Sequence, residues 1–537
     1  MRVRPRCQDC TLPYSACVHV LLICVQRKLD RSIAYFAIFL FDCVGFGLPC
    51  TRFALSLNAY TQRLKARGGY RVIEPPVGSF LLPGKMASTE ERRFVPTQLL
   101  LEKLIVSTCI RSLYPLASII AQHENIETRD MTNILSAMQF LVMVTCFFTP
   151  TVQRALGLRN LSVACMCFVS IMWLMLALST SLAVFTTGVI LVGIARGLLY
   201  PTILTITSSL YEQQEQGKVV AFVEFSWGLC SLIGLPLVGL LMSIDFKLPF
   251  FVLSGVCLVL ACASFWVLRW VDKVKGKTDS GKLSERRSLC SYVSQFLGVV
   301  TMVCRTPEAV AMLITNFCVV VAMNIAFISF GLWLVFTHGF GAAGVGAAGF
   351  VIGAAEFMAE GVLLILLRHW PGKAGHLYIL RMFFVGSMLS YGGLAFVLQP
   401  GIHVAVGLTG FFFTFFCFET TIVCQLGMVG SVTYNLSTTE DAATTATSSE
   451  YIDGVSTIVS GGPDDAGNAG KKDEGIMESA SFMSTSLGGV IGPIISTYLW
   501  DAGAAWPGIA GVIFTLVSLL AWVLLGHLNG HGSPEKG

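Results

Sequence analysis

The stretch AFVEFSWGLCSLIGLPLVGLL (residues 221–241) is long and apolar enough to cross a bilayer as a helix, apart from one carboxylate, Glu224. A Gly-Leu-Pro step follows, in which Pro236 removes a helical hydrogen bond and Gly234 allows a neighbouring helix to approach closely. A charge within a membrane is costly and is usually functional. The stretch therefore predicts a transmembrane helix that can bend, with Glu224 as a functional residue within it.

The composition of the whole chain supports a membrane protein. Of its 537 residues, 54% are hydrophobic and 13% are charged, whereas about 25% are charged in soluble domains. We therefore expect an all-α integral membrane protein. The net charge of +4 is small and gives no reason to expect a nucleic-acid partner. The 18 cysteines scatter through apolar runs, and the single CxxC at Cys7 and Cys10 has no second pair, so no disulfide framework, metal or cofactor is predicted.

Twelve apolar runs approach the length of about 20 residues that a membrane-spanning helix needs. They lie near residues 104–122, 131–149, 161–180, 183–208, 218–243, 249–271, 308–336, 341–367, 377–398, 401–430, 476–499 and 505–527. The predicted domains are an amino-terminal extension (1–100), a six-helix bundle (101–271), a cytoplasmic linker (272–306) and a second six-helix bundle (307–530). A Ser/Thr/Gly/Asp-rich insert at 435–475 is predicted to be disordered.

Basic residues in the loops predict the orientation of the helices. The loops after the second, fourth, sixth and eighth runs contain thirteen Lys and Arg residues, whereas the alternate loops contain two, Arg129 and Lys247. Because basic loops are retained on the cytoplasmic side, we expect both ends of the twelve-helix core to be cytoplasmic.

Residues 1–85 do not fit this core, since they hold six cysteines and one weak apolar run at 32–48 that contains Asp42. One interpretation is a targeting segment or a thirteenth helix. The other is upstream sequence ahead of an initiator at Met86. We favour the second, because Met86 begins a short polar lead-in to the first strong helix.

The two six-helix halves repeat one another. Pro236 in the fifth run corresponds to Pro493, which follows Gly492 in the eleventh run. Arg154 in the loop after the second run corresponds to Arg368 after the eighth. Two parallel repeats around a central path are typical of a secondary transporter.

Five blocks of the sequence resemble the major facilitator superfamily, and the likeness extends over about residues 100–530. The fifth-run block resembles a motif of its drug/proton-antiporter-like branch. The blocks are RSLYP (111–115), GIARGLLYP (193–201), EFSWGLCSLIGLPLVGLL (224–241), AAEFMAEG (354–361) and FCFETTIV (416–423). The resemblance implies a major facilitator fold, with two six-helix bundles related by a pseudo-two-fold axis and helices 1, 4, 7 and 10 lining a central cavity.

The gate loops depart from the superfamily pattern. The loop after helix 2 usually contains an Asp-Arg pair, but Gln153 stands where the Asp is expected, while Arg154 and Arg159 remain. The loop after helix 8 keeps Arg368 and also lacks the Asp. We expect these arginines to act at a gate, and Pro236, Gly492 and Pro493 to act as hinge residues.

Polar residues within the apolar runs form the candidate substrate and coupling site. The resemblance places one on each cavity-lining helix: Arg111, Arg196, Asn324 and Glu419. Glu224 follows Arg196 on the next helix, and a guanidinium is the partner that makes a buried carboxylate tolerable, so we expect these two to pair. Tyr114 is a further candidate, because its ring can line a solute pathway.

Three acids of the second half are candidates for proton coupling. Glu356 and Glu360 are four residues apart and share one helical face, where each disfavours ionisation of the other. Polar partners for one or both are the alternative. Glu419 lies in the most apolar setting, FFFTFFCFETTIV, which disfavours its charged form. We therefore expect Glu419 to carry the coupling proton.

These observations predict secondary active transport of a small organic solute by alternating access, coupled to protons, by a monomer in the lipid bilayer. The alternative is a transporter-like receptor or scaffold that no longer cycles, which the altered gate loops favour. A membrane-embedded enzyme is disfavoured, because no HExxH, GxSxG or His-rich metal cluster lies in or beside the helices. No catalytic residue is therefore assigned.

Overall fold

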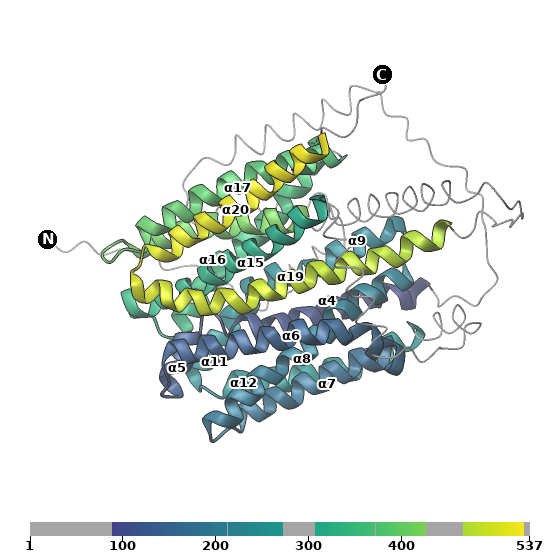
Figure 1. Cartoon of the computed structure of the whole chain (residues 1–537). Helices are drawn as coiled ribbons and strands as arrows, with labels where there is room; N and C mark the ends of the chain where they lie inside the picture. Colours follow the sequence, from purple (N-terminus) through teal and green to yellow (C-terminus); the bar gives the residue numbers. More distant parts are fainter. Residues whose placement is uncertain (1–88, 212, 272–306, 371, 426–465, 531–537) are drawn as a thin grey trace, which may run out of the picture. The chain divides into compact units, whose positions relative to one another are not determined.

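The computed structural model describes residues 89–211, 213–271, 307–370, 372–425 and 466–530, and in these ranges it is helical without strands (Figure 1). Within these ranges, eleven spans are long and apolar enough to cross a membrane, and we number them second to twelfth after the predicted runs that they match. The first half contains α4 (Thr89–Arg111), α5 (Ala117–His123), α6 (Thr128–Leu156), α7 (Leu158–Ala177), α8 (Leu182–Leu210), α9 (Gln213–Glu224), α10 (Ser226–Leu229), α11 (Leu235–Ile244) and α12 (Leu248–Val267). The second half contains α15 (Pro307–Leu332), α16 (Ala342–His369), α17 (Gly372–Val397), the span Val404–Gln425, α19 (Ala466–Ala502) and α20 (Trp506–Gly530).

The first predicted run, 104–122, is not one helix. Helix α4 begins at Thr89 and ends at Arg111, a turn follows, and α5 begins at Ala117. Pro115 explains the break, because it has no N–H to donate to the Arg111 carbonyl. That carbonyl instead accepts the Tyr114 N–H at 3.3 Å, which tightens the chain into a turn. The other eleven predicted runs correspond to the eleven membrane-length spans.

The predicted domain boundaries meet the described residues only in part. Helix α4 begins within the predicted extension, at Thr89, and α19 begins within the predicted insert, at Ala466. Most of the extension, the linker at 272–306 and the insert residues before Ala466 lie outside the described residues.

The fifth span, Val219–Ile244, is continuous but irregular. A π-helical segment, Cys230–Gly234, separates α10 from α11, and Pro236 lies in the first turn of α11. Because Pro236 has no N–H, the regular hydrogen bonding of the helix is interrupted near the carbonyl of Leu232, and the wider turn occurs at this place. The expected irregularity of helix 5 is thus a π segment.

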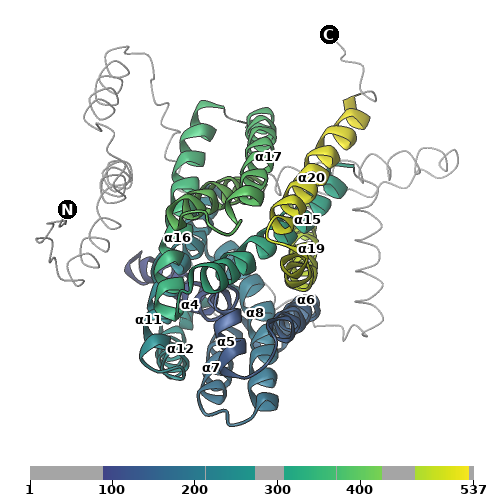
Figure 2. The same ribbon diagram turned by 90° about the vertical axis from the view of Figure 1, so that its left-hand side faces the viewer.

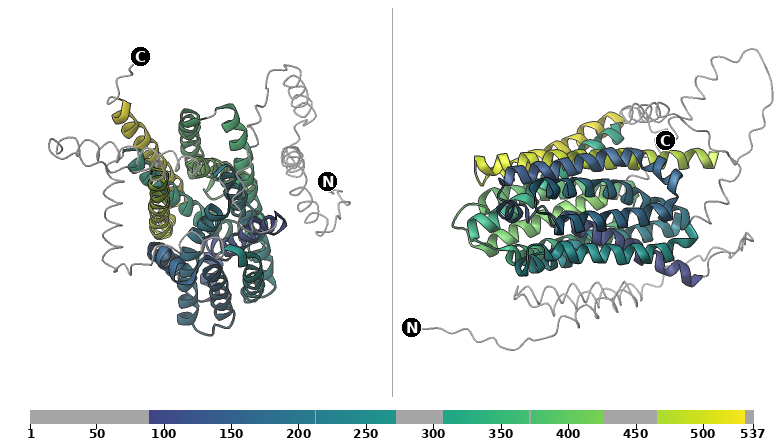
Figure 3. Two further views of the ribbon diagram at one scale, coloured as in Figure 1. Left: turned by 90° about the vertical axis from the view of Figure 1, so that its right-hand side faces the viewer. Right: turned by 90° about the horizontal axis from the view of Figure 1, so that it is seen from below.

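The two halves meet through two pairs of helices, α6 with α19 and α11 with α16. Figure 2 shows these pairs on different sides of the bundle, and Figure 3 shows the long helices running roughly parallel. In order along the chain, α6 is the second span and α16 the eighth, while α11 belongs to the fifth and α19 is the eleventh. A pseudo-two-fold axis that exchanges the halves therefore converts one contact into the other. This is the architecture of the major facilitator fold.

Contacts between the halves are close at one end of the bundle, which holds the loops at 124–127, 245–247, 338–341 and 503–505. We call it the Glu124 end; the basic-loop pattern predicts that it is extracellular. The Thr132 and Thr497 hydroxyls lie 3.3 Å apart there. A Cβ at Gly239 would lie 2.5 Å from the Ala342 carbonyl oxygen. The structure is therefore closed between α6 and α19 and between α11 and α16 at this end.

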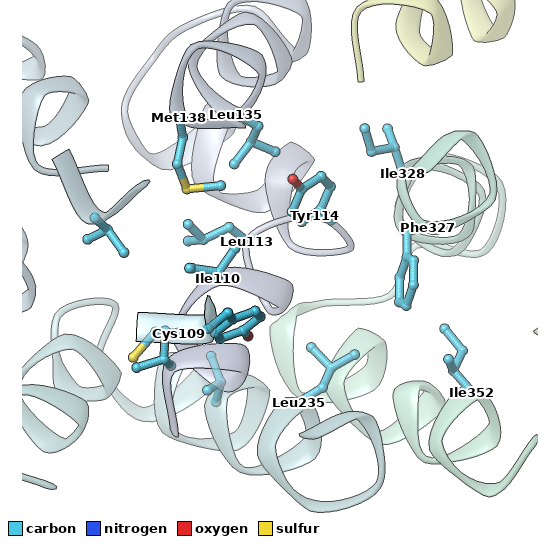
Figure 4. Close-up of a cluster of buried hydrophobic side chains, with 14 of the residues drawn as sticks. Cys109, Ile110, Leu113, Tyr114, Leu135, Met138, Leu235, Phe327, Ile328 and Ile352 are labelled. Carbon is cyan, nitrogen blue, oxygen red and sulfur yellow. The ribbon is translucent and has the colours of Figure 1, made fainter. Parts of the chain in front are cut away.

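The turn after α4 also lies between the halves. Figure 4 shows Leu113 and Tyr114 with Leu135 of α6 on one side and Phe327 of α15 on the other. A Cβ at Gly331 of α15 would clash with the carbonyl of Pro115. The glycine thus allows α15 to reach the broken first span.

Candidate functional site

An ion pair joins the two halves in the middle of the membrane-spanning region. Arg111 lies at the last residue of α4, and Glu356 lies in α16. The guanidinium donates to both carboxylate oxygens, from Nη1 to Oε2 at 3.1 Å and from Nη2 to Oε1. The side chains are 8% and 0% exposed, so water hardly screens the pair.

Aromatic rings and a backbone carbonyl complete the environment of Arg111. Its Cζ lies 4.8 Å from the ring centroid of Trp227 in the first half and 4.6 Å from that of Phe327 in the second. Nη1 also donates to the Trp227 carbonyl oxygen at 3.0 Å, just before the π segment. A planar guanidinium can stack and hydrogen-bond at once, which an ammonium cannot do in the same way.

The partner predicted for Glu224 was wrong. Glu224 Oε2 lies 2.5 Å from Lys103 Nζ in α4, and no ion pair joins Arg196 and Glu224, both of which are described. Lys103 lies two helical turns before Arg111, so α4 presents two cations on one face. Lys103 pairs with Glu224 of α9 in its own half, and Arg111 pairs with Glu356 of the opposite half.

Arg196 of α8 lies against the same aromatic side chains. Its Cζ is 5.3 Å from the Tyr200 ring centroid and 5.7 Å from that of Trp227. Among the described residues, its Nε has no hydrogen-bond partner. Lys103 Nζ lies at 5.5 Å and 5.8 Å from the same two rings. The rings of Tyr200 and Trp227 thus each make cation–π contacts with both Lys103 and Arg196.

The acids of the second half outnumber their cationic partners. Glu360, one turn after Glu356 in α16, is 7% exposed, and no described residue forms a hydrogen bond with its Oε1. Glu419, in the Val404–Gln425 span, is 6% exposed. Glu360 and Glu419 interact electrostatically with one another, with Glu356 and with Lys103. Neither forms an ion pair with a described cation.

We name this group the central charge cluster. It consists of Lys103, Arg111, Arg196, Glu224, Glu356, Glu360 and Glu419. All three cations come from the first half, and three of the four acids come from the second half. The cluster therefore holds the halves together by charge where they face each other, with one negative charge in excess if every group is ionised.

Two of the predicted site residues lie apart from these ion pairs. Tyr114 accepts a hydrogen bond from Gln139 Nε2 at 2.5 Å. Asn324 donates to the Val320 carbonyl of its own helix at 2.9 Å and packs against Gly492 of α19. Asn324 thus helps to pack the second half instead of meeting the charges.

The predicted gate and hinge residues are spread over the ends and interior of the bundle. Arg159, in the first turn of α7, stacks at 4.0 Å on the Phe265 ring, and Arg368 is exposed in the last turn of α16. Arg154 lies in α6, and its side chain is outside the described positions. Pro493 is buried within α19, next to Gly492. Their gate and hinge roles stay predictions.

Lys103 and Glu102 were missed by the sequence analysis, because the first run was taken to begin at residue 104. The signal that could have found them is the apolar triplet Leu99–Leu101 before them, which continues the helical run backwards. An adjacent acid and base at a run boundary look like a solvated helix end. Here both are buried: Glu102 is 0% exposed and Lys103 is 5% exposed.

The fold and this cluster define a multi-pass membrane protein of the transporter class, built from two repeated bundles with opposite charges at their interface. The chain belongs to the Major Facilitator Superfamily, whose family model matches residues 103–448. No curated protein matches the chain. The superfamily consists of membrane transporters of small solutes and is generally not enzymatic, so membrane transport is the general function of this protein.

Proposed function

We propose that the protein carries a small organic solute across the membrane by alternating access, and that transport is coupled to protons. The observation that carries the proposal is the bidentate Arg111–Glu356 ion pair between the halves. A buried pair is stable only while both charges and their hydrogen bonds are satisfied. Separation of the halves must break it, so a ligand or proton that replaces one partner lowers the cost of opening.

Proton coupling is supported by the excess of buried acids. An ionised carboxylate without a cation is costly to bury, and several neighbouring carboxylates increase the cost. Glu419 meets both conditions, since it is buried and interacts with Glu356 and Glu224. A proton removes that charge, and its release toward one side of the membrane restores it. We therefore propose Glu419 as the proton carrier, with Glu360 as the next candidate.

The test is transport into proteoliposomes. Candidate solutes are first screened with and without a pH gradient. Glu419→Gln, which mimics the protonated acid, should bind the identified solute and retain exchange of solute for solute, but lose accumulation driven by the gradient. Glu124→Gln, in the loop between α5 and α6, is the matched control and should behave as the parent protein does.

The outcomes separate the alternatives. Gradient-driven accumulation by Glu419→Gln would remove Glu419 as the carrier and make Glu360→Gln the next variant to test. Binding of solutes without flux or exchange in the parent protein would support the non-transporting receptor or scaffold.

The orientation is part of the proposal. In a cysteine-free background, a single cysteine at Gln122, which is exposed in α5, should react with a membrane-impermeant maleimide from the outside of cells. Labelling from the outside is the result expected if both ends of the helical core are cytoplasmic. Reaction only after the cells are opened would reverse the orientation.

A further inference from the structure

A second buried acid lies on a different face of α4 from the central charge cluster. Glu102 is 0% exposed and contacts two other helices of the first half. Its Oε2 accepts from Ser162 Oγ of α7 at 2.7 Å. Its Oε1 accepts from Gln98 Nε2 at 3.2 Å and is in hydrogen-bond contact with Ser264 Oγ of α12. No described cation lies within ion-pair distance of Glu102.

The hydrogens around Ser264 can be counted. Its Oγ accepts from Gln98 Nε2 at 2.8 Å, lies 2.7 Å from the Leu260 carbonyl oxygen and contacts Glu102 Oε1. A hydroxyl has one hydrogen. If it donates to Leu260, the contact between Ser264 and Glu102 needs a hydrogen from the acid. If it donates to Glu102, a hydroxyl oxygen and a carbonyl oxygen are left 2.7 Å apart with no hydrogen between them.

Neither alternative donor resolves the shortage. The Leu260 carbonyl has no hydrogen to give. Rotation of the Gln98 amide would place an oxygen against these acceptors and remove hydrogens instead of adding one. A proton on Glu102 Oε1 removes the shortage at Ser264, because the acid then donates to Ser264, Ser264 donates to Leu260, and Ser162 donates to Glu102 Oε2. The two hydrogens of Gln98 Nε2 remain shared among Ser264, Glu102 and the Leu260 carbonyl oxygen, which lies 3.3 Å away.

We propose that Glu102 binds a proton in this state and forms, with Gln98, Ser162 and Ser264, a proton-binding site separate from the central charge cluster. The physical cost points the same way, since a neutral acid is far cheaper to bury than a lone carboxylate. The inference does not rest on the proposed transport function.

The other ionisable groups nearby do not neutralise Glu102. On α4, Lys103 is paired with Glu224 of α9. On α7, Cys165 is within electrostatic range, and Arg159 stacks on the Phe265 ring of α12. Two further thiols, Cys109 of α4 and Cys257 of α12, contact each other.

Proton binding at this site is linked to the position of α4. The protonated network connects α4 to α7 and α12, whereas an ionised Glu102 leaves Ser264 short of one hydrogen bond. Helix α4 also carries Lys103 and Arg111, the two cations that form ion pairs. Loss of the proton therefore weakens the attachment of the helix that holds both pairs.

Thermal unfolding of purified full-length protein tests the proposal. In an unfolded chain glutamate ionises above about pH 4, so keeping the proton in the fold costs more stability as the pH rises. Glu102→Gln keeps the shape of the protonated acid and a hydrogen-bond donor toward Ser264, without that cost. Its melting temperature should match the parent's at low pH and exceed it increasingly from pH 5 to pH 8. A melting temperature below the parent's across this range, or failure to fold, would show that Glu102 is ionised and overturn the proposal.

A control and a second measurement complete the test. Glu224→Gln is the matched control; it removes the acid paired with Lys103 and should lower the melting temperature at neutral pH. Infrared spectra at neutral pH, in a Glu360→Gln, Glu419→Gln background, should show a protonated-carboxyl band that Glu102→Gln abolishes. Identical spectra with and without Glu102→Gln would also overturn the proposal.

Discussion

Removal of Arg111 should expose the cost of the buried charge that it neutralises. Glu356 is 0% exposed, and both of its oxygens accept from the guanidinium. Arg111→Ala leaves a buried carboxylate unpaired, a change that typically costs about 3–5 kcal/mol. The carboxylate can escape by taking up a proton. Starting from the ordinary glutamate pKa of about 4.3, holding a proton at pH 7 costs about 4 kcal/mol. The unpaired carboxylate and the protonated acid therefore lower the stability of Arg111→Ala by a similar amount, about 4 kcal/mol at pH 7.

The proton route also gives a pH dependence. In Arg111→Ala, folded Glu356 holds a proton that the unfolded chain releases, so the stability of the variant falls as the pH rises. In the parent protein, the Arg111 guanidinium stabilises the ionised form of Glu356 in the fold, so this slope is weaker. The deficit of Arg111→Ala relative to the parent should therefore shrink by up to about 1.4 kcal/mol for each pH unit from pH 7 toward pH 5.

The assay is equilibrium unfolding in mixed micelles at pH 5 and pH 7, with a double-mutant cycle. Arg111→Ala combined with Glu356→Gln should lose less than the sum of the single losses, with a coupling energy of about 2–3 kcal/mol. Arg196→Ala is the matched control, because Arg196 lies in the same cluster without an ion pair to a described residue, and its loss should not depend on pH. Additive losses and a deficit of Arg111→Ala that is constant with pH would refute the reasoning.

The corrected partner of Glu224 can be checked in the same way: Lys103→Ala and Glu224→Ala should be coupled, whereas Arg196→Ala and Glu224→Ala should add, and the reverse pattern would contradict the observed pair. Gly331→Ala should destabilise the protein by about 1–3 kcal/mol, because its Cβ meets backbone atoms of the turn after α4. Gly393→Ala, where a Cβ meets no described neighbour within 4 Å, is the control in thermal unfolding and should not destabilise the protein, since Ala is the better helix former. Equal effects of the two glycine changes would argue against close packing at that turn.

The transmembrane character of the chain could be predicted from sequence because it is a local property. An apolar run such as 183–208 must satisfy its own backbone hydrogen bonds in lipid, so its length and composition fix a helix wherever its neighbours lie. Proline is similarly local. Pro236 predicted an irregular helix 5, whereas the break at Pro115 followed from the same missing N–H and was overlooked.

The candidate site shows where local reasoning ends. Glu356, Glu360 and Glu419 could be selected from sequence, because a charge in an apolar run is conspicuous at any position. Lys103 was not selected in this way, since it stands at the edge of the predicted run and its burial depends on how far α4 continues before that run.

Partners within the site were decided by the tertiary structure alone. Arg111 and Glu356 are 245 residues apart in sequence and meet because the two bundles face each other. Adjacency along the chain suggested Arg196 for Glu224, but Lys103 of α4 is the partner instead. Sequence therefore determined which segments enter the membrane and most of the charges that enter with them. Only packing decided which charges meet, because a buried ion pair depends on distances between helices that no single helix specifies.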